Sequence, residues 1–378
     1  MKILQIASFK LGACGPTSVL IPVIKRLNEK GHIVDVFSPY VFDENKNMKI
    51  DSLGSNYYYK EKRRSVNKDV LLRDIPELNT YDVVHIHGIF NIDHIIIARI
   101  LYKMKIPYIV SLHGNLMENA LQHSKFKKKV ALNLFIKNML QKAATLHVLA
   151  KEEEVDIIKA IGETRKYSII HNGVEPSSYS NLLRESSNGM LNILFIGRID
   201  VHHKGIDILF KALENLDKKW KGKICLYLVG PFDSTLDEEL VSNFLVNNDN
   251  LREMVKIEGP KYGEEKQEYY NKCDLFIHTS RYEGMPMAVL EAMQSGLPCL
   301  VTNATNMGSI MNESNGGFVI NLNVNSIVDT IHNILNNPKE DLKLYGVNAR
   351  QWCNENLNWN NITDRYEEMY CETVMLRN

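Results

Sequence analysis

Short apolar runs rich in isoleucine and valine recur along the chain, and segments with helical spacing of apolar residues separate them. Six such runs occupy the first half: KILQIAS (2–8), HIVDVFS (32–38), DVVHIHG (82–88), PYIVSLHG (107–114), TLHVLA (145–150) and YSIIHNG (167–173). Continuous apolar runs of this length are typical of strands that are buried on both faces of a parallel sheet. The pattern therefore predicts a series of βαβ units.

A second series of the same kind fills the other half. Its runs are NILFIGRI (192–199), CLYLVGP (225–231), VKIEGP (255–260), DLFIHTS (274–280) and PCLVTN (298–303). The serine-rich stretch 175–190 between the two series predicts an interdomain linker or hinge. In such α/β folds ligands bind at the carboxyl ends of the strands, so the strand-end loops are the place to look for chemistry.

These patterns predict an α/β protein with two tandem, doubly wound Rossmann-like domains that face a central cleft. The first domain covers residues 1–174 and the second covers 191–357. The segment 358–378 predicts a C-terminal helix that can pack back on the first domain. A chain of 378 residues is long enough for two hydrophobic cores.

Composition narrows the class of protein further. The hydrophobic share of 44% and the charged share of 24% are ordinary for a folded, water-soluble protein. The six cysteines form no CxxC pair and no zinc-ligand spacing, which argues against a disulfide framework or a structural metal. With no signal-peptide pattern and no apolar run of about 18 residues, we expect a cytoplasmic protein that does not span a membrane.

The net charge of zero hides an uneven distribution. The first 150 residues hold 22 lysines and arginines against 12 aspartates and glutamates. This asymmetry indicates an anionic partner such as a membrane surface, or two solvated domains whose opposite charges help them face each other.

The segment 124–140 carries much of that basic charge, in a run of lysines around Phe126, Val130 and Leu134. Because these apolar residues recur every four positions, a helix would place them on one stripe. The stripe could rest peripherally on an anionic leaflet, or it could pack against the first sheet with the lysines in water.

A strand-to-helix loop in the second half brings two cations together. In IGRIDVHHKGIDIL (196–209) the strand ends at Arg198 and the helix begins near Gly205, which leaves Lys204 in the same loop. Helix N-termini favour anions, and a guanidinium with an ammonium can neutralise a diphosphate without a metal ion. Two solvated surface cations are the alternative.

Two glutamates eight positions apart mark a second strand-end loop, RYEGMPMAVLEAMQSGLP (281–298). Pro286 suits the first turn of a helix that ends near Gly296, so Glu283 lies in the loop and Glu291 lies inside the helix. The two carboxylates can then reach different parts of one extended ligand.

Carboxylates accept hydrogen bonds from vicinal hydroxyls, which suits sugar hydroxyls for Glu283 and a nucleotide ribose for Glu291. The N–H groups of Met287 and its neighbours Gly284 and Met285 add phosphate contacts at the start of the helix. A bare pair of surface glutamates is the alternative interpretation.

Four segments taken together resemble the retaining glycosyltransferases of family 4, of the bacterial surface-polysaccharide type. They are GRI…KG (197–205), LVG (228–230), the E-x7-E loop (278–303) and HNGVE (171–175). That family has the GT-B fold. In the first half the resemblance is looser and consists of a glycine-containing first loop and the strand ends HIHG and SLHGN.

The resemblance implies a catalytic set of His113, Arg198, Lys204 and Glu283. It also implies a donor-binding set made of Gly15, Arg198, Lys204, Glu283, Gly284, Met285, Met287 and Glu291. In these sets Arg198 and Lys204 hold the donor diphosphate, and His113 lies close to the sugar and its phosphate. For His85 and His87 two interpretations stay open: hydrogen-bonded core groups, or a direct role.

By this resemblance the chain moves a hexosyl or N-acetylhexosaminyl group from a nucleoside-diphosphate sugar, UDP-linked first and GDP-linked second, to a saccharide acceptor. We expect α-retention, no metal, no cofactor and no nucleic-acid partner. If the segment 124–140 rests on a leaflet, a lipid-linked saccharide in capsule, O-antigen or exopolysaccharide synthesis is the expected acceptor.

Departures from the family pattern fall mainly on the acceptor side. The first loop has Ala13-Cys14-Gly15-Pro16 where many relatives have two glycines and an acidic residue, and Gly114 follows His113 where many have an acidic residue. The segment 302–319 lacks the glycine and glutamate often found there. The alternatives are an epimerase or phosphorylase on the same fold, and a two-domain sugar-binding protein without enzymatic activity.

Overall fold

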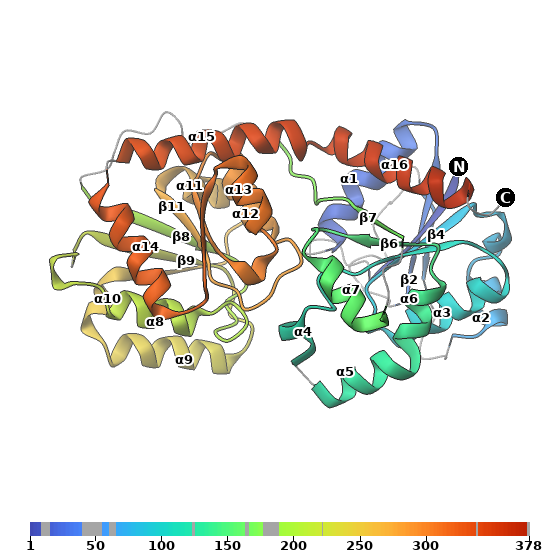
Figure 1. The fold of residues 1–378 in the computed structure, drawn as a ribbon, viewed down its shortest axis with the longest axis horizontal. Coiled ribbons are helices and arrows are strands. Elements are labelled where there is room, and N and C mark those ends of the chain that lie inside the picture. The colour runs from blue at the N-terminus through green and yellow to red at the C-terminus, as the bar shows by residue number, and fades with distance from the viewer. Residues whose placement is uncertain are drawn as a thin grey trace. The chain divides into compact units, whose positions relative to one another are not determined.

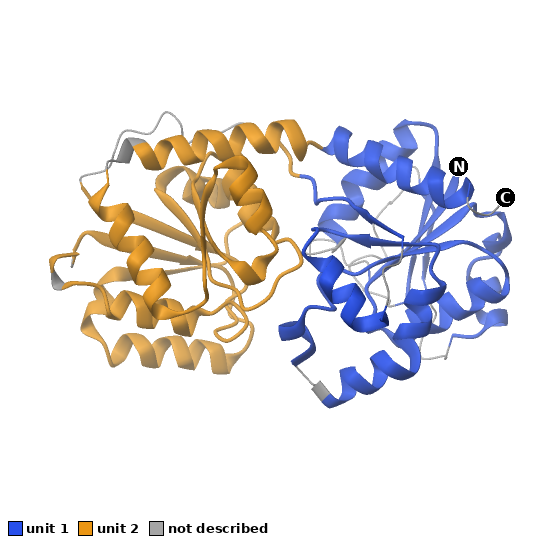
Figure 2. Cartoon of the chain, in the orientation of Figure 1, with its two compact units in different colours: residues 1–173, 359–378 blue, residues 174–358 orange. Residues whose placement is uncertain are grey.

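The computed structural model describes residues 1–8, 16–39, 55–59, 66–122, 125–162, 166–176, 189–220, 222–337 and 339–375. The chain divides into two compact units, shown in Figure 2. The first unit comprises residues 1–173 and 359–378, and the second comprises residues 174–358. Of the predicted linker, residues 177–188 lie outside the described part.

The first unit is built on a parallel sheet of seven strands in the order β3-β2-β1-β4-β5-β6-β7. The strands are β1 (Lys2–Ile6), β2 (Ile33–Ser38), β3 (Tyr57–Tyr59), β4 (Val83–His87), β5 (Tyr108–Ser111), β6 (Thr145–Val148) and β7 (Tyr167–Ile169). The order reverses at β1, so the sheet is doubly wound, as predicted. The six predicted strands are all present, and β3 is an addition at the edge of the sheet.

Helices cover this sheet, as the ribbon in Figure 1 shows. They are α1 (Pro16–Glu29), α2 (Lys68–Asp74), α3 (Ile92–Lys103), α4 (Glu118–Gln122), α5 (Lys125–Ala131), α6 (Lys137–Lys142), α7 (Glu153–Ile161) and α16 (Trp359–Met375), with a 3₁₀ turn over Leu78–Thr80. A π-helical turn, Leu132–Ile136, interrupts the single helix predicted over 124–140. Apolar residues of α2, α3, α6 and α7 share one buried core with the strands.

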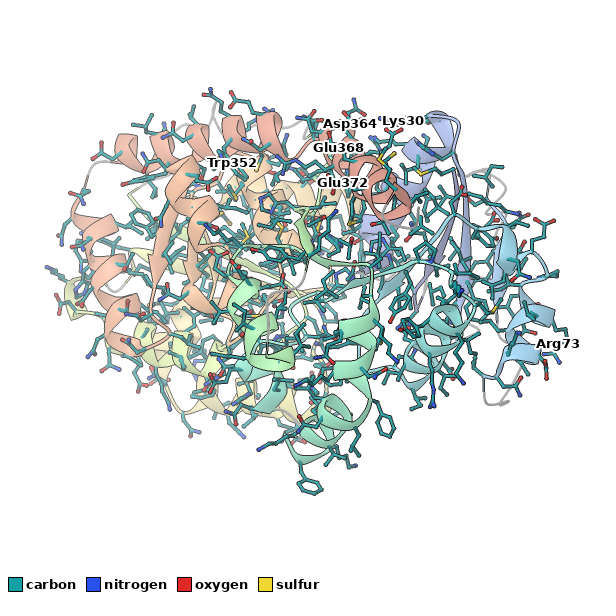
Figure 3. The ribbon with its side chains drawn as sticks, turned by 45° about the vertical axis from the view of Figure 1, so that its right-hand side comes forward. Lys30, Arg73, Trp352, Asp364, Glu368 and Glu372 are labelled. Carbon is teal, nitrogen blue, oxygen red and sulfur yellow. The ribbon has the colours of Figure 1, made fainter. Side chains whose placement is uncertain are left out.

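The C-terminal helix α16 belongs to the first unit, although residues 174–358 come before it. Lys30, next to α1, forms ion pairs with Asp364 and Glu367 of α16, and Figure 3 labels two of these residues. Trp359 is buried against Gly173, where a Cβ atom would lie 2.4 Å from the indole ring. The chain therefore leaves the first unit and returns to it at one point.

The second unit contains a parallel sheet of six strands in the order β10-β9-β8-β11-β12-β13. The strands are β8 (Leu191–Ile196), β9 (Ile224–Val229), β10 (Val255–Gly259), β11 (Leu275–His278), β12 (Cys299–Thr302) and β13 (Gly317–Ile320). The five predicted strands are present, and β13 extends the sheet. The order reverses at β8, so the loops after β8 and β11 meet at the switch point where ligands bind in such folds.

Eight helices are described in this unit. They are α8 (Ile206–Glu214), α9 (Thr235–Val246), α10 (Asp249–Met254), α11 (Gly263–Lys272), α12 (Met287–Gln294), α13 (Gly308–Ser314), α14 (Val324–Asn336) and α15 (Lys339–Asn356), with short 3₁₀ turns at Lys218–Trp220 and Asn303–Thr305. Helices α8, α10 and α14 pack together in one group, and α12, α13 and α15 pack together in another. Both groups bury their apolar sides, which leaves the strand-end loops to carry polar groups.

Candidate active site

The loops after β8 and β11 pack tightly against each other. Gly205 has a φ of +67°, and a Cβ atom there would lie only 2.2 Å from the carbonyl oxygen of Thr279. The Thr279 hydroxyl donates to the carbonyl of Lys204 at 2.8 Å. Arg281 binds both carboxylate oxygens of Asp207 at 2.8 Å, which ties the second loop to the start of α8. Glycine is therefore required at position 205, where the loop that carries Lys204 crosses the end of β11.

Lys204 and Glu283 form an ion pair at this crossing. Glu283 Oε1 also accepts from the Ser280 hydroxyl at 3.1 Å and lies 3.4 Å from His278 Nε2. Among the described residues no group is bonded to the other oxygen, Oε2. Glu283 is therefore anchored through one oxygen and offers the second as an acceptor.

The surroundings keep Glu283 ionised. Burial acts to raise its pKa, but the hydrogen bond from His278 and the charge of Lys204 outweigh burial and hold the pKa below its ordinary range. Burial lowers the pKa of His278, so its ring is neutral near pH 7. A carboxylate held in this way is a fixed acceptor of hydrogen bonds.

Glu291 is anchored in the same manner on helix α12. Its Oε2 lies 2.5 Å from Lys266 Nζ and accepts from the Tyr270 hydroxyl at 2.8 Å, and both partners stand on α11. No described group bonds to Oε1. The Glu291 side chain as a whole is 31% exposed.

Arg198 takes a different partner from Lys204. It forms an ion pair with Asp233, in the loop that follows β9, and its side chain is 50% exposed. An isolated β-bridge between Ile199 and Phe232 holds the two loops side by side. The structure thus brings Lys204 into direct contact with Glu283 of the loop after β11, whereas Arg198, in the same loop as Lys204, pairs with Asp233 of the loop after β9.

Helix α12 begins where the sequence predicts. Pro286 precedes Met287, and its carbonyl accepts from Val289 N at 3.1 Å, which closes the first turn. Gly284 and Met287 are partly exposed, whereas Met285 is 5% exposed and packs inward. The first N–H groups of a helix have no partner within that helix, so this end of α12 is suited to an anion.

In the first unit, His113 follows β5 in a strained turn. Its φ is +50°, which is uncommon for a residue other than glycine, and Gly114 follows with a φ of +70°. The buried carboxylate of Glu153 accepts from Gly114 N at 3.0 Å and from Leu149 N at 2.8 Å. Glu153 therefore holds the turn of His113 against the end of β6. Gly15, the remaining predicted residue, lies outside the described part.

The two histidines of β4 are buried and hydrogen-bonded. His85 lies between Tyr370 and Ser111, at 2.9 and 2.7 Å, and His87 contacts Gln5 at 2.9 Å. His87 Nδ1 also lies 3.2 Å from Nε2 of His113. Of the two interpretations, the contacts favour core groups, although both histidines connect to a predicted site residue.

Comparison with known proteins identifies the family. Residues 15–178 match the family described as Glycosyltransferase Family 4, and residues 185–352 match the family described as Glycosyl transferases group 1. The chain is a family 4 glycosyltransferase.

Relatives of this glycosyltransferase span most of its length. An uncharacterized glycosyltransferase of Methanocaldococcus jannaschii is 25% identical, and the match covers 93% of each chain. The UDP-Gal:alpha-D-GlcNAc-diphosphoundecaprenol alpha-1,3-galactosyltransferase of Escherichia coli is also 25% identical, over 78% of this chain and 76% of that protein.

Solved structures establish the fold. Anabaena HepE, crystallised with UDP and glucose, superposes with a TM-score of 0.76 at 16% identity, covering 98% of this chain and 100% of that one. The glycosyltransferase therefore has the GT-B fold, as the sequence predicts.

Several residues of the site escaped the sequence analysis. They are Asp207, Asp233, Lys266, Tyr270, His278, Ser280 and Glu153. For His278 and Ser280 a signal existed, because they end the predicted strand DLFIHTS. Lys266 and Tyr270 stand four residues apart on α11 and so share a helix face, but only the tertiary fold brings that face to Glu291.

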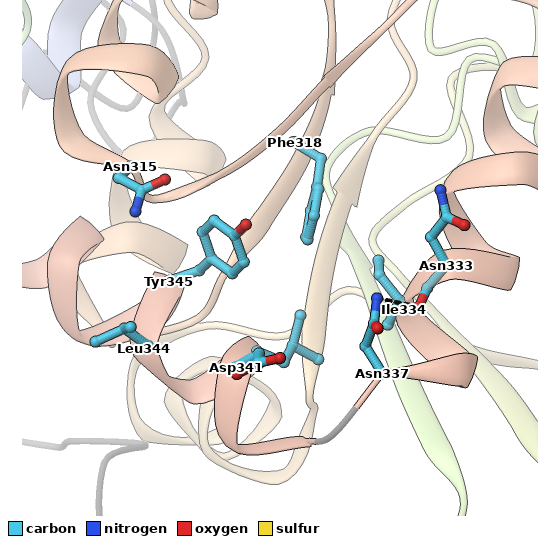
Figure 4. Close-up of a pocket in the computed structure, with 9 residues that line it drawn as sticks. Asn315, Phe318, Asn333, Ile334, Asn337, Asp341, Leu344 and Tyr345 are labelled. Carbon is cyan, nitrogen blue, oxygen red and sulfur yellow. Dashed lines mark hydrogen bonds between the residues drawn. The ribbon is translucent and has the colours of Figure 1, made fainter.

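A hollow of about 230 Å³ lies elsewhere in the second unit, and Figure 4 shows residues that line it. Phe318 and Tyr345 line it, together with Asn315, Asn333 and Asn337 and neighbouring side chains. It includes none of the predicted site residues. Within the described ranges, no helix is long and apolar enough to cross a membrane, and no three His, Cys, Asp or Glu side chains gather as a metal site.

Proposed function

We propose that this glycosyltransferase transfers a hexosyl or N-acetylhexosaminyl group from a nucleoside-diphosphate sugar, with retention of the α configuration. UDP is the first expected nucleotide and GDP the second. The observation that carries this proposal is the matched anchoring of Glu283 and Glu291, each through one oxygen, with Lys204 paired to Glu283. Two fixed carboxylate acceptors, one of them paired with a cation, suit an extended ligand with hydroxyls at both ends and a diphosphate between them.

The names of similar proteins support the choice of donor and acceptor. The E. coli relative uses UDP-Gal, forms an alpha-1,3 linkage and acts on a diphosphoundecaprenol-linked sugar. The Anabaena structure contains UDP and glucose. We therefore favour a UDP-sugar and a lipid-linked saccharide acceptor in the synthesis of a surface polysaccharide.

In the proposed reaction the bond between the anomeric carbon and the diphosphate breaks while the acceptor oxygen bonds to that carbon on the same face. The departing diphosphate takes the proton of the acceptor hydroxyl. Lys204, Arg198 and the first N–H groups of α12 stabilise the negative charge that develops on the leaving group. Glu283 holds a sugar hydroxyl, and Glu291 holds the ribose.

A segment with exposed apolar side chains supports a lipid-linked acceptor. Phe126 is 81% exposed, Leu134 is 65% exposed and Phe135 is 49% exposed, and exposed lysines 127 and 129 lie among them. The apolar stripe of 124–140 thus faces away from the core, which disfavours packing against the sheet. Apolar side chains beside exposed lysines suit peripheral contact with an anionic leaflet.

The enzymatic proposal is tested by transfer itself. The purified full chain, in EDTA, is incubated with UDP-galactose, UDP-glucose, UDP-N-acetylglucosamine or GDP-mannose and with undecaprenyl-diphosphate N-acetylglucosamine. We expect one donor to give a disaccharide with an α linkage, shown by a small H1–H2 coupling for a galactosyl or glucosyl product and by the one-bond C1–H1 coupling for a mannosyl product. A β-linked product, or activity that appears only with added divalent metal, would contradict the proposed mechanism.

The membrane proposal needs a separate test. The chain should sediment together with vesicles of phosphatidylglycerol. With vesicles of phosphatidylcholine it should stay in the supernatant. The double variant F126S/L134S should lose most of this binding, and V246S, which removes an exposed apolar residue of the second unit, serves as the matched control. Equal binding by both variants would reject the segment 124–140 as the contact.

A further inference from the structure

Two adjacent histidines in the loop after β8 have different surroundings. His202 is exposed, whereas the side chain of His203 is only 16% exposed. The His203 ring stacks on the ring of Tyr282 in the loop after β11, with the ring centroids 4.1 Å apart and an angle of 23° between the planes. The carbonyl oxygen of His203 also accepts from Arg281 N at 2.8 Å. The side chain of His203 is therefore part of the contact between the two loops.

The His203 ring donates a hydrogen bond to the backbone of the loop after β11. Its Nε2 lies 2.9 Å from the carbonyl oxygen of Tyr282. Because a carbonyl oxygen can only accept, Nε2 carries the proton. The carboxylate oxygen Oε1 of Glu283 is 3.8 Å from the same nitrogen, which is too long for a hydrogen bond. The ring thus bonds to the peptide group that precedes Glu283 and not to the carboxylate.

That peptide group is held on both sides. Its carbonyl, from Tyr282, accepts from His203, and its N–H, from Glu283, donates to the carbonyl of Ala304 at 2.9 Å. Ala304 lies in the 3₁₀ turn Asn303–Thr305, which follows β12. Because a peptide group is planar, holding both its carbonyl and its N–H restricts the position of the Glu283 Cα atom.

The charge state of the His203 ring suits a bond to a neutral peptide group. Burial lowers the pKa of His203, and the opposing charges of Glu283 and Lys204 offset each other in part. The ring is then neutral near pH 7, with a proton on Nε2 and a lone pair on Nδ1. Nδ1 is 3.9 Å from Asp200 Oδ2, whereas Asp200 Oδ1 accepts from the backbone N of His203 at 2.8 Å. Asp200 therefore holds the backbone of His203, and the ring donates to the other loop.

We propose that His203 is a positioning residue, whose Nε2–H fixes the peptide group before Glu283 and thereby the carboxylate that pairs with Lys204. The contact of Glu283 with the donor sugar rests on the function proposed above. His203 itself need not touch the donor. Its effect on the reaction follows because a small displacement of a group that orients a substrate lowers the rate of the chemical step.

Two substitutions separate the hydrogen bond of His203 from its ring contact. His203→Phe keeps a ring that can stack on Tyr282 but removes the N–H donor. His203→Gln removes the ring but keeps an NH₂ group that can donate to the Tyr282 carbonyl. His202→Phe makes the first change at the exposed neighbouring histidine and is the matched control.

Amide hydrogen exchange of the full chain tests the contact without a donor. In His203→Phe the Glu283 amide should exchange about tenfold faster than in the wild type, because one side of its peptide group is released. In His203→Gln and His202→Phe this exchange should stay within about threefold of the wild type. Unchanged exchange in His203→Phe, or equal acceleration in His203→Gln, would overturn the proposal. Nitrogen NMR of the wild type should show His203 protonated at Nε2, and protonation at Nδ1 would also overturn it.

Transfer kinetics test whether the contact reaches the reaction, with the donor and acceptor identified in the transfer assay. His203→Phe should lower kcat/KM about tenfold, whereas His203→Gln and His202→Phe should not. In a Glu283→Ala background, His203→Phe should lower kcat/KM less than about twofold, because the carboxylate that the ring positions is gone. A loss of about tenfold in both backgrounds would mean that His203 acts independently of Glu283 and would contradict the proposal. Failure of the proposed function would appear as absence of transfer in the wild type, and the exchange result would stand or fall separately.

Discussion

The carboxyl ends of the strands carry different chemistry in the two units. In the first unit they hold buried, neutral groups that hydrogen-bond to one another, such as His85, Ser111 and His147. In the second unit they hold partly exposed ion pairs, Lys204 with Glu283 and Arg198 with Asp233. Neutral networks orient a group without placing charge near it, whereas ion pairs supply charge to a ligand. The same fold thus presents neutral hydrogen-bonding groups in one unit and charged groups in the other.

The largest effect should come from removing the central cation of the second unit. Lys204→Met should lower kcat on the order of 10³-fold, because an ammonium placed at the leaving group stabilises charge that develops mainly in the transition state. Circular dichroism should show an intact fold. Lys211→Met, which removes an exposed lysine from the same helix region, should have little effect. Activity within twofold of the wild type would remove Lys204 from the proposed site.

Acid should weaken the first unit before the second. The lowered pKa values of His85, His87, His113 and His147 mean that these rings take up protons only when the unit unfolds. Stability is then lost as pH falls below about 6.5, by up to about 1.4 kcal/mol per pH unit for each ring.

Two acidic groups in the first unit oppose this trend in part. Burial raises the pKa of Glu153 to about 7 and that of Asp156 to about 6, so both favour the folded state as pH falls from about 7. In the second unit the lowered pKa values of His278 and His203 have the same effect, but these are fewer rings than in the first unit. Glu283 loses its stabilising contribution only below its ordinary pKa, outside this window. Hydrogen exchange at pH 7 and pH 5, corrected for intrinsic rates, should show the greater loss of protection in residues 1–173. A greater loss in residues 174–358 would contradict the comparison.

The hydrogen bonds that Glu153 accepts at the His113 turn can be weakened by changing a single atom of its carboxylate. Glu153→Gln replaces one of two carboxylate acceptors with an amide NH₂, which cannot accept from Gly114 N or Leu149 N. The unsatisfied donor should cost about 1–3 kcal/mol of unfolding free energy. Thermal unfolding measures the loss, with Glu152→Gln, exposed and adjacent in sequence, as the control. An unchanged melting temperature would mean that the turn does not depend on this carboxylate.

A smaller effect is expected at the ribose end of the donor. In Glu291→Gln the amide oxygen should stay with Lys266 and Tyr270, which are donors, so the NH₂ group would replace the free oxygen. The ribose would then meet a donor in place of an acceptor, and the dissociation constant for UDP should rise about tenfold. Titration calorimetry measures this change, with the exposed Glu268→Gln as the control. Equal affinity in the two variants would reject the ribose assignment.

The architecture was largely predictable from the sequence, because buried parallel strands are continuous apolar runs. The strands β3 and β13 were missed for local reasons. Tyr57–Tyr59 is a three-residue edge strand, and Gly317–Ile320 begins with a glycine whose added Cβ would lie 1.9 Å from the carbonyl oxygen of Cys299. β3 is shorter than the central strands, and β13 is as long as β11 and β12 but begins with a residue that is depleted in strands.

The site was predictable only where its residues adjoin a strand end or a helix start. Lys204 and Glu283 satisfy that condition, whereas Glu291 lies inside α12 and was singled out by the E-x7-E spacing of the resemblance. The residues that bond to them from other elements do not satisfy it, since nothing in the sequence places Lys266 beside Glu291. The same is true of Tyr370, which bonds to His85 in the first unit. The hydrogen bond from Gln5 to Tyr370 was also out of reach, because the two residues stand 365 positions apart.

The central claim is that the charged strand ends of the second unit bind a nucleoside diphosphate without a metal. Thermal unfolding of the full chain in EDTA, with and without UDP, tests this claim most directly. UDP at 100 times its dissociation constant should stabilise the wild type by about 2.7 kcal/mol, and the same concentration should give Lys204→Met little or no stabilisation. Failure of UDP, GDP and ADP alike to raise the melting temperature of the wild type would contradict the account.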